Sequence, residues 1–250
     1  MYRSASIILA IRIDNTMFSE YFTNLNYCLE SLNKVSKNNL SLERIIVDWG
    51  SLPDYSKKIQ ELVSRFNFSY WYSGATYWSR SQALNFAVSR VTGSRTLVID
   101  ADTVVPASYI LDHLGKASTT NYTLSYVYNS LVKGEEKRAD AKELKNLPGK
   151  MRYSGRSHIG VDTSWLKTNK YNNRYVGWGG EDDDLIVRMQ LSGLKEIVVN
   201  SAPVHLWHNS YGNVMHALGK ESGKWYDENK AKNKSRFVKL RQGYKKTIKK

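Results

Sequence analysis

Apolar residues in the first hundred positions form short continuous runs, which alternate with stretches of helical periodicity. Four runs have the length and continuity of strands buried on both faces, at 4–14, 43–51, 67–73 and 95–106. Three stretches between them place apolar side chains three and four positions apart, as on one helix face, at 15–36, 53–66 and 79–93. Ser79 is a suitable cap for the third helix and Gly93 a suitable stop. The alternation predicts an α/β fold with a mostly parallel sheet flanked by helices.

The second half of the chain has a less regular pattern. Its expected elements are a strand at 121–131, a mobile charged surface segment at 133–150, a short helix at 161–169, a helix at 181–193, and one or two strands at 195–210. From about residue 212 the chain becomes polar and basic. We therefore expect one domain over residues 1–211 and a basic, helical C-terminal extension over residues 212–250.

Composition places the chain among globular proteins. Its 250 residues are 41% hydrophobic and 12% aromatic, which is enough apolar material for a large core. The single cysteine, Cys28, excludes an internal disulfide and a cysteine-based metal site. We find no apolar run of membrane-spanning length and no signal peptide pattern. These observations predict a cytoplasmic protein, with peripheral attachment to the inner face of a membrane left open.

The basic charge is concentrated at the C-terminus. Residues 220–250 hold twelve Lys and Arg and three acidic side chains, so nine of the fourteen excess positive charges lie there. Such a charge implies a polyanionic neighbour, namely a glycan, an anionic membrane or DNA. The apolar residues of this segment recur at helical spacing: Phe237, Val238, Leu240, Tyr244 and Ile248. A helix lying on an anionic surface, a helix packed on the domain and a frayed terminus all remain open.

Acidic residues follow three of the expected strands. Asp14, Asp48 and the pair Asp100 and Asp102 stand where ligands bind in parallel α/β sheets, beyond the carboxyl ends of the strands. Each alone is also ordinary turn chemistry. Two aspartates flanking one residue suit a divalent cation and the phosphates that it carries.

Two histidines, His205 and His208, stand three positions apart in the sequence HLWHN. Neutral histidine is a common metal ligand. Residues three apart in a strand point to opposite faces, so both reach one ion only where the backbone bends. Each histidine taken alone is as readily a surface or core residue.

The stretch GWGGEDDDL, residues 177–185, combines a glycine-rich loop with four consecutive carboxylates. Acidic residues are favoured in the first turn of a helix, which explains some of them without any function. Gly179 and Gly180 allow the backbone to approach a ligand closely, and Trp178 offers a ring beside them. A carboxylate held there could act as a general base.

Three motifs together resemble a known family. SRSQALNFA, VIDADTVVP and YVGWGGEDDDLIVRM occur in the order and spacing of GT-A fold glycosyltransferases. The chain is most similar to the beta-1,4-galactosyltransferase group, family 7, and to bacterial relatives near family 2. The resemblance covers roughly residues 4–210 and implies the GT-A, Rossmann-like fold. One departure is Val176, where the family block has a tryptophan.

The resemblance implies roles for individual residues. Asp100 and Asp102 match the D-x-D motif that binds Mn²⁺ or Mg²⁺ and the donor diphosphate, with Asp102 as the metal ligand. His208 matches the family's histidine ligand, and His205 stands where the family has a second, softer metal ligand. Asp182 matches the catalytic base and Glu181 the neighbouring residue that holds the acceptor. The implied substrate-binding residues are Arg12, Asp14 and Asp48 at the nucleoside, Arg80 on the donor side, and Trp178, Gly179 and Gly180 at the sugars.

The expected activity is that of a metal-dependent, inverting glycosyltransferase. It would move a sugar from a nucleotide-sugar donor, a UDP-sugar, to a hydroxyl of a glycan or glycolipid. Two alternatives stay open: transfer to hydroxymethylated DNA bases, and a non-enzymatic basic protein that binds nucleic acid. No protein partner is inferred. The sequence names neither the sugar nor the acceptor.

Overall fold

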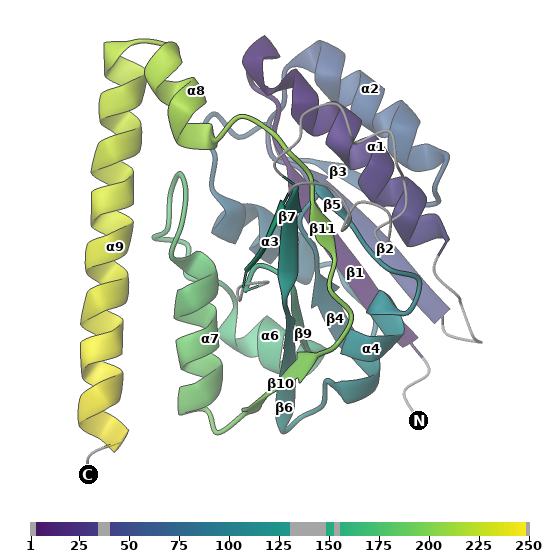
Figure 1. Ribbon diagram of the computed structural model, residues 1–250, viewed down its shortest axis with the longest axis vertical. Helices are drawn as coiled ribbons and strands as arrows, with labels where there is room; N and C mark the ends of the chain where they lie inside the picture. Colours follow the sequence, from purple (N-terminus) through teal and green to yellow (C-terminus); the bar gives the residue numbers. More distant parts are fainter. Residues whose placement is uncertain (1–3, 35–40, 131–148, 153–155, 249–250) are drawn as a thin grey trace.

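A seven-stranded sheet forms the centre of the computed structural model, which describes residues 4–34, 41–130, 149–152 and 156–248 (Figure 1). The strand order is β10-β6-β9-β4-β1-β2-β3, with β9 antiparallel to both neighbours and the other pairs parallel. The strands of this sheet are β1 (Ser4–Ile11), β2 (Ser41–Asp48), β3 (Ser69–Tyr72), β4 (Arg95–Val98), β6 (Asn121–Ser125), β9 (Ile159–Asp162) and β10 (Lys195–Val199).

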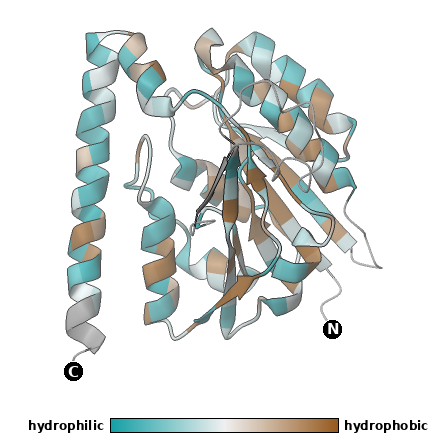
Figure 2. Ribbon diagram, in the orientation of Figure 1, coloured by the Kyte–Doolittle hydropathy of each residue, from teal (hydrophilic) through white to brown (hydrophobic). Residues whose placement is uncertain are grey.

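Helices cover both faces of this sheet. The helices of the described residues are η1 (Thr16–Phe18), α1 (Ser19–Asn33), α2 (Pro53–Ser64), α3 (Arg80–Val88), α4 (Tyr109–Lys116), α6 (Thr163–Asn169), α7 (Glu181–Leu191), α8 (Tyr211–Ala217) and α9 (Lys220–Ile248), of which α9 packs on α7 and α8. Alternate residues of β1 point to opposite faces: Ile7 packs with the residues of α1 and α2, and Ile8 with those of α3 and α7. The strands are accordingly the most hydrophobic part of the ribbon in Figure 2.

A second, four-stranded sheet lies at the carboxyl ends of the large one. Its order is β5 (Thr103–Val104), β11 (Val204–His205), β7 (Val127–Ser130) and β8 (Gly149–Arg152). Strand β5 is antiparallel to β11 and follows β4 after a four-residue turn. This small sheet therefore brings the segment after β4 next to a segment a hundred positions further along the chain.

The predicted α/β architecture, with a mostly parallel sheet flanked by helices, is confirmed. The expected strand at 121–131 is two strands in different sheets, and the segment 195–210, expected to hold one or two strands, holds two. Gly93 was wrong as a helix stop, because α3 ends at Val88. Its Cα instead packs so closely on Ala5 of β1 that a Cβ would lie 2.4 Å from the Ala5 carbonyl carbon. The expected charged segment, 133–150, lies outside the described residues except for Gly149 and Lys150, which belong to β8.

The C-terminal helix α9 runs alongside α7, as Figure 1 shows. The packed side chains recur at helical spacing, with Tyr226 and Asn233 buried and Phe237, Leu240 and Tyr244 half-buried. Of the stripe expected from the sequence, Val238 instead points to solvent, with 42% exposure. The helical prediction for this segment is confirmed, and its apolar stripe packs on the domain. No helix in the part of the chain that the structure describes is long and apolar enough to cross a membrane.

Candidate active site

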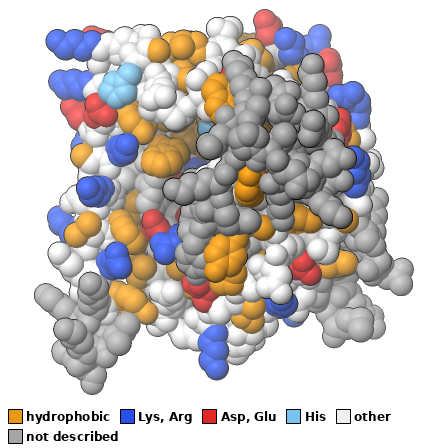
Figure 3. Space-filling model, in the orientation of Figure 1, with side chains coloured by type: hydrophobic (Ala, Val, Ile, Leu, Met, Phe, Trp, Pro, Cys, Tyr) orange, Lys and Arg blue, Asp and Glu red, His pale blue; other side chains and the backbone are white. Residues whose placement is uncertain are grey.

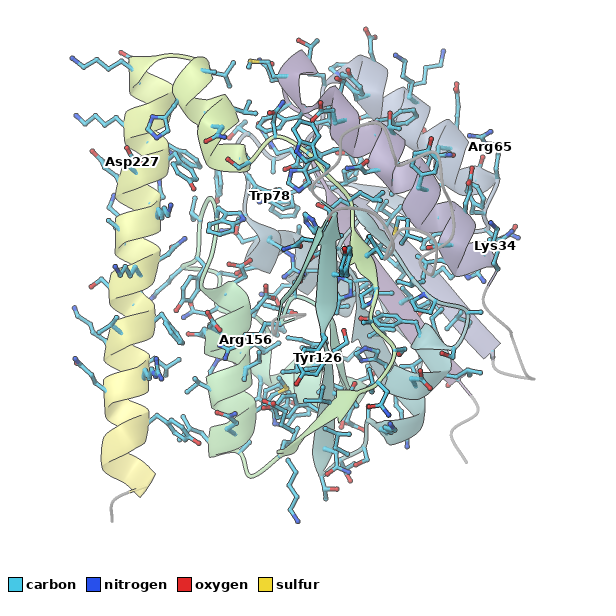
Figure 4. All side chains as sticks on the ribbon, viewed as in Figure 1. Lys34, Arg65, Trp78, Tyr126, Arg156 and Asp227 are labelled. Atoms are coloured by element: carbon cyan, nitrogen blue, oxygen red, sulfur yellow. The ribbon has the colours of Figure 1, made fainter. Side chains whose placement is uncertain are left out.

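An open cavity of about 770 Å³ lies beyond the carboxyl ends of the central strands. Its walls come from the segment after β1, the turn after β4, the loop and first turn of α7, the segment after β11, and α9. Figure 4 labels Trp78 and Arg156, two of its lining residues, on the side of the sheet where α7 and α9 stand. The predicted site residues that line this cavity are Arg12, Asp14, Arg80, Asp100, Asp102, Trp178, Gly179, Gly180, Glu181, Asp182, His205 and His208.

Three of these residues form a cluster suited to a metal ion. Oδ2 of Asp102 lies 3.2 Å from Nε2 of His208 and 3.5 Å from Nε2 of His205, and the two Nε2 atoms are 3.3 Å apart. The potential ligand atoms all lie within 4.8 Å of one another. Both histidines reach one point because β11 ends at His205, so His208 lies outside the strand and is not bound by its alternation of faces. The sequence required that both histidine side chains reach one ion, and this requirement is met.

Long-range pairing of β5 with β11 assembles this cluster. Thr103 pairs with His205 across the two strands, and the backbone N–H of Leu206 donates to the carbonyl of Asp102 at 2.9 Å. These contacts fix the backbone at Asp102 and Thr103 beside that at His205 and Leu206. They therefore hold Asp102 against His205.

The ring of His208 is held in a defined orientation. Its Nδ1 lies 2.7 Å from the carbonyl of Asn209, which can only accept, so Nδ1 carries the proton and Nε2 faces Asp102. The ring also packs on Tyr21, with centroids 4.5 Å apart. Burial alone would lower the pKa of His208, but the hydrogen bond and charge of Asp102 outweigh it and raise that pKa.

A second cluster is organised by Arg80, the first residue of α3. One terminal nitrogen donates to Asp182 at 2.5 Å and lies 3.9 Å from Glu181. The other donates to Asp100 at 2.8 Å and to the carbonyl of Ser157 at 3.0 Å. One guanidinium thus joins the carboxylate after β4 to those at the start of α7.

Three carboxylates around one guanidinium leave an excess of negative charge. Burial raises the pKa of both Asp182 and Glu181, and the attraction of Arg80 only partly offsets it. For Asp100, burial also acts against ionisation, but Arg80 and His158 outweigh it and lower the pKa. The pKa shifts therefore run in opposite directions on the two sides of Arg80, down at Asp100 and up at Asp182 and Glu181. Raised carboxyl pKa values in a cleft are a mark of functional sites.

The remaining acidic residues of GWGGEDDDL have structural partners. Asp183 pairs with Arg156. Asp184 is buried, binds Nε of Arg188 at 2.7 Å and accepts from Tyr175 at 3.2 Å. Asp183 and Asp184 are therefore explained by these structural contacts, whereas Glu181 and Asp182 lie beside Arg80 in the cavity wall.

The glycine-rich loop before α7 has a conformation that glycine favours. Gly177, Gly179 and Gly180 have φ values of +76°, +90° and +94°. A Cβ at Gly180 would lie 2.8 Å from the Tyr175 ring. The loop leaves Trp178 55% exposed on the cavity wall.

Asp48 is the predicted site residue that lies outside the cavity. It has no exposed surface and does not line the cavity. One carboxylate oxygen accepts from the backbone of Ser51 at 2.8 Å, and the other accepts from the hydroxyls of Ser56 and Tyr70 at 2.7 and 2.8 Å. In this arrangement its carboxylate ties β2, α2 and β3 together and does not face the cavity.

Arg12 and Asp14 line the cavity and are paired with each other at 2.6 Å. Arg12 also donates to the carbonyls of Trp49 and Ala75 at 2.7 and 2.6 Å, which connects the loops after β1, β2 and β3. Asp14 is the more exposed partner, with a side-chain exposure of 29%.

His158 is a site residue that the sequence did not single out. It is 1% exposed, and its Nε2 accepts from the backbone N–H of Asp100 at 3.2 Å. Its Nδ1 therefore carries the proton and donates to Tyr109 at 2.8 Å, and Tyr109 in turn lies 2.7 Å from the hydroxyl of Ser125. Burial lowers the pKa of His158 to about 4. The neutral ring positions the backbone of Asp100. The sequence did not indicate this role, because it depends on packing across β4, β6 and β9.

Family comparisons agree with this geometry. The family described as "Glycosyl transferase family 2" matches residues 16–173, which is more than half of the chain. The chain belongs to glycosyl transferase family 2. A second family, described as "N-terminal domain of galactosyltransferase", matches residues 154–214, which include the glycine-rich loop and both histidines of the cluster. The family resemblance predicted from the motifs is confirmed.

Curated relatives of this family 2 member match it over a short region. Human beta-1,4-galactosyltransferase 3 is 38% identical over 63 residues, which cover 25% of this chain and 15% of that protein. Human beta-1,4-galactosyltransferase 4 is 43% identical over 51 residues, or 18% of this chain and 14% of that protein. The chain thus spans about a seventh of the length of these relatives.

Solved structures of similar fold cover most of the family 2 chain. GalNAc-T7 with UDP, GalNAc and Mn²⁺ superposes with a TM-score of 0.63 at 16% identity, covering 84% of this chain and 44% of that one. Staphylococcus aureus TarS 1-349 with UDP-GlcNAc gives 0.60 at 15% identity, covering 86% and 65%. The mannosyltransferase PcManGT from Pyrobaculum calidifontis, with GDP-Man and Mn²⁺, gives 0.56 at 13%, covering 93% and 70%. The predicted GT-A fold is confirmed.

Proposed function

We propose that this protein is a metal-dependent, inverting glycosyltransferase that moves a sugar from a nucleotide-sugar donor to a hydroxyl group of a glycan or glycolipid. The observation that carries the proposal is the meeting of two clusters in one cavity. Asp102, His205 and His208 converge on one point, and Asp182 stands in the other cluster, joined to Asp100 through Arg80.

The first cluster fits a divalent cation. It offers one carboxylate oxygen and two imidazole nitrogens, and a neutral His208 ring with its proton on Nδ1 would present Nε2 to the metal. Imidazole suits Mn²⁺ better than Mg²⁺, which prefers oxygen ligands, so we favour Mn²⁺. A bound cation would stabilise, as a Lewis acid, the charge on a departing nucleoside diphosphate. Structural neighbours solved with Mn²⁺ and UDP or GDP-Man support this assignment by analogy.

The second cluster supplies the base. Asp182 would remove the proton from the attacking hydroxyl, and the rise in its pKa caused by burial makes it a stronger base than an exposed aspartate. Glu181, beside it and 7% exposed, would hold the acceptor. A base on the side of the sugar opposite the leaving group gives inversion. Arg80 would keep the base oriented until the acceptor arrives.

The division of the cavity suggests where the substrates lie. Arg12 and Asp14, at the end of β1, and Asp102 would form the donor side, where a UDP-sugar binds. Trp178, on the loop that leads into α7, would form the acceptor side, with its exposed ring against a sugar face. Cytoplasmic location, with attachment at a membrane surface, stays a proposal that rests on the basic α9.

A donor screen tests the proposal directly. The purified protein is incubated with MnCl₂, one UDP- or GDP-sugar at a time and a mixture of glycan acceptors, and released nucleoside diphosphate is measured. The expected result is release with at least one donor, abolished by chelation and restored by Mn²⁺. Failure to bind UDP or GDP in the presence of Mn²⁺, measured by calorimetry, would contradict the proposal.

Modified DNA is the alternative acceptor, and the formal charge of +14 is as compatible with it as with a glycan or a membrane surface. An enzyme that acts on a base in duplex DNA must first take the base out of the stack. Phosphate contacts would give DNA binding a steep dependence on salt. A filter-binding series at several salt concentrations separates this alternative from a glycan acceptor. Calorimetry with Mn²⁺ and a nucleoside diphosphate separates both from a non-enzymatic nucleic-acid-binding protein, which would bind neither.

A further inference from the structure

Helix α9 holds the glycine-rich loop of the cavity in place. The side-chain amide of Asn233, which is 2% exposed, donates to the carbonyls of Val176 and Trp178 at 2.9 and 3.3 Å. The ring of Trp225 lies against Gly177, where a Cβ would meet it at 3.5 Å. The C-terminal segment, for which packing on the domain was one of the possibilities left open by the sequence, therefore forms a wall of the site.

Lys230 extends from this helix into the cavity wall. Its ammonium lies 5.9 Å from the ring centroid of Trp178 and 5.3 Å from that of Tyr226, and all three residues line the cavity. Such contacts hold a cation over an aromatic face without neutralising its charge. Lys230 is exposed, so its ammonium can meet a ligand.

The other basic residues that line the cavity within the described ranges are already paired. Arg12 binds Asp14, Arg80 binds Asp100 and Asp182, and Arg156 binds Asp183. No described carboxylate lies within 4 Å of the Lys230 ammonium, whose contacts are with the two rings. Among the Lys and Arg residues that line the cavity in the described part of the chain, Lys230 is therefore the one whose charge is available to a ligand.

We propose that Lys230 forms, with the exposed ring of Trp178, a subsite for an acceptor sugar that carries an anionic group, either a carboxylate or a phosphate. The Trp178 ring would pack on the apolar face of the sugar, and the Lys230 ammonium would bind its anionic group. The start of α7 carries Glu181, Asp182 and Asp183, which would repel an anionic acceptor without a cation nearby. This inference rests on the proposed function, because it assigns the acceptor of that same site.

Ligand-observed NMR titrations with three glycosides test the subsite without donor or turnover. The probes are methyl β-glucoside, methyl β-glucuronide and methyl β-glucoside 6-phosphate, which differ only at C6. We expect the wild type to bind at least one of the anionic probes more tightly than the neutral one. Lys230→Met keeps the length of the side chain and should weaken that probe about threefold to tenfold, leaving the neutral one unchanged. Lys230→Arg should retain the preference.

Lys234→Met is the matched control, because Lys234 is exposed one turn further along α9 and does not line the cavity. It should bind all three probes as the wild type does. The proposal is overturned if the wild type prefers neither anionic probe, or if Lys230→Met and Lys234→Met behave alike. It is also overturned if Lys230→Met weakens UDP binding as much as probe binding, since the cation would then serve the donor.

These outcomes are separate from those of the donor screen. A protein that binds the anionic probes through Lys230 but turns over no nucleotide sugar keeps the subsite and loses the proposed activity. A protein that turns over a donor but shows no dependence on Lys230 keeps the activity and loses the subsite.

Discussion

Arg80 and Asp182, which stand 102 positions apart in the chain, form a hydrogen bond of 2.5 Å in the cavity. The same guanidinium binds Asp100, two positions before the proposed metal ligand Asp102. The proposed base and the proposed donor side are therefore joined by one side chain. An enzyme that keeps its base paired in this way orients it before the acceptor hydroxyl arrives.

Asp182→Asn is expected to lower the rate of sugar transfer by about 10²–10⁴-fold, because loss of a general base removes an effect of that size. Binding of UDP with Mn²⁺ should change by less than about twofold, since Asp182 is not part of the metal cluster. Asp54→Asn is the control for an acidic residue that lies only in the first turn of a helix, here α2. If both variants retained wild-type turnover, Asp182 would be a helix-start residue and no more.

The raised pKa of Asp182 also predicts how stability depends on pH. The native state keeps this proton where the unfolded state, with an ordinary aspartate pKa of about 3.9, has lost it. Its contribution to stability is therefore present below pH 4 and lost as the pH rises through the folded pKa. The melting temperature of Asp182→Asn relative to wild type should increase from pH 4 to pH 9 in a thermal shift series. A difference that shrinks over this range would contradict the raised pKa.

Removal of the metal ligands should abolish stabilisation by Mn²⁺. A ligand at about 100 times its Kd stabilises the native state by about 2.7 kcal/mol, so Mn²⁺ should raise the melting temperature of the wild type. It should not protect Asp102→Ala. His208→Ala should weaken Mn²⁺ binding more than His205→Ala in calorimetry, because the His208 ring is fixed by Asn209 and lies nearer to Asp102.

His216→Ala serves as the control for this series. His216 is exposed, pairs with Asp227 at 3.3 Å and lies outside the metal cluster. Equal protection by Mn²⁺ of the wild type and of Asp102→Ala would place the metal elsewhere.

Asp48→Ala should destabilise the protein without changing donor affinity. The substitution leaves the backbone N–H of Ser51 and the hydroxyl of Tyr70 without their buried acceptor, at about 1–3 kcal/mol for each unsatisfied group. Chemical denaturation should report this loss, and UDP affinity should stay within about twofold. The opposite result, unchanged stability with weaker UDP binding, would restore the nucleoside role that the family resemblance implies.

The exposed basic residues of α9 should bind anionic surfaces. In Figure 3, Lys and Arg side chains follow the edge of the molecule where α9 lies. A variant with four of them changed to Gln, at Lys232, Lys234, Lys239 and Arg241, should bind anionic vesicles more weakly at low salt. Its melting temperature should match the wild type, since these side chains point to solvent. Truncation is less informative here, because α9 supports the glycine-rich loop.

The control changes four exposed basic residues elsewhere, namely Lys57, Lys58, Arg65 and Lys116, to Gln. Equal loss of vesicle binding in both variants would mean that overall charge and not α9 is responsible. Parallel measurements with duplex DNA test whether the same surface binds nucleic acid.

The strands, the helices and the acidic residues at the strand ends could be predicted from the chain, because periodicity and turn chemistry are local properties. Such patterns predict the apolar run that forms β4, the cap at Ser79 and the helix that begins at Glu181. The motifs also indicated which carboxylates to examine. Local patterns, however, do not say which distant segments meet.

Tertiary packing decided the partners of these residues. Asp102 meets His205 because β5 pairs with β11, and Arg80 meets Asp182 because the starts of α3 and α7 face one cavity. Asp48 looked like its neighbours at the strand ends, yet packing of β2 against β3 and α2 turned its carboxylate inward. The basic charge of α9 was visible in the sequence. Its role as a wall depends on Asn233 reaching a loop 55 positions earlier, a contact that only the folded chain creates.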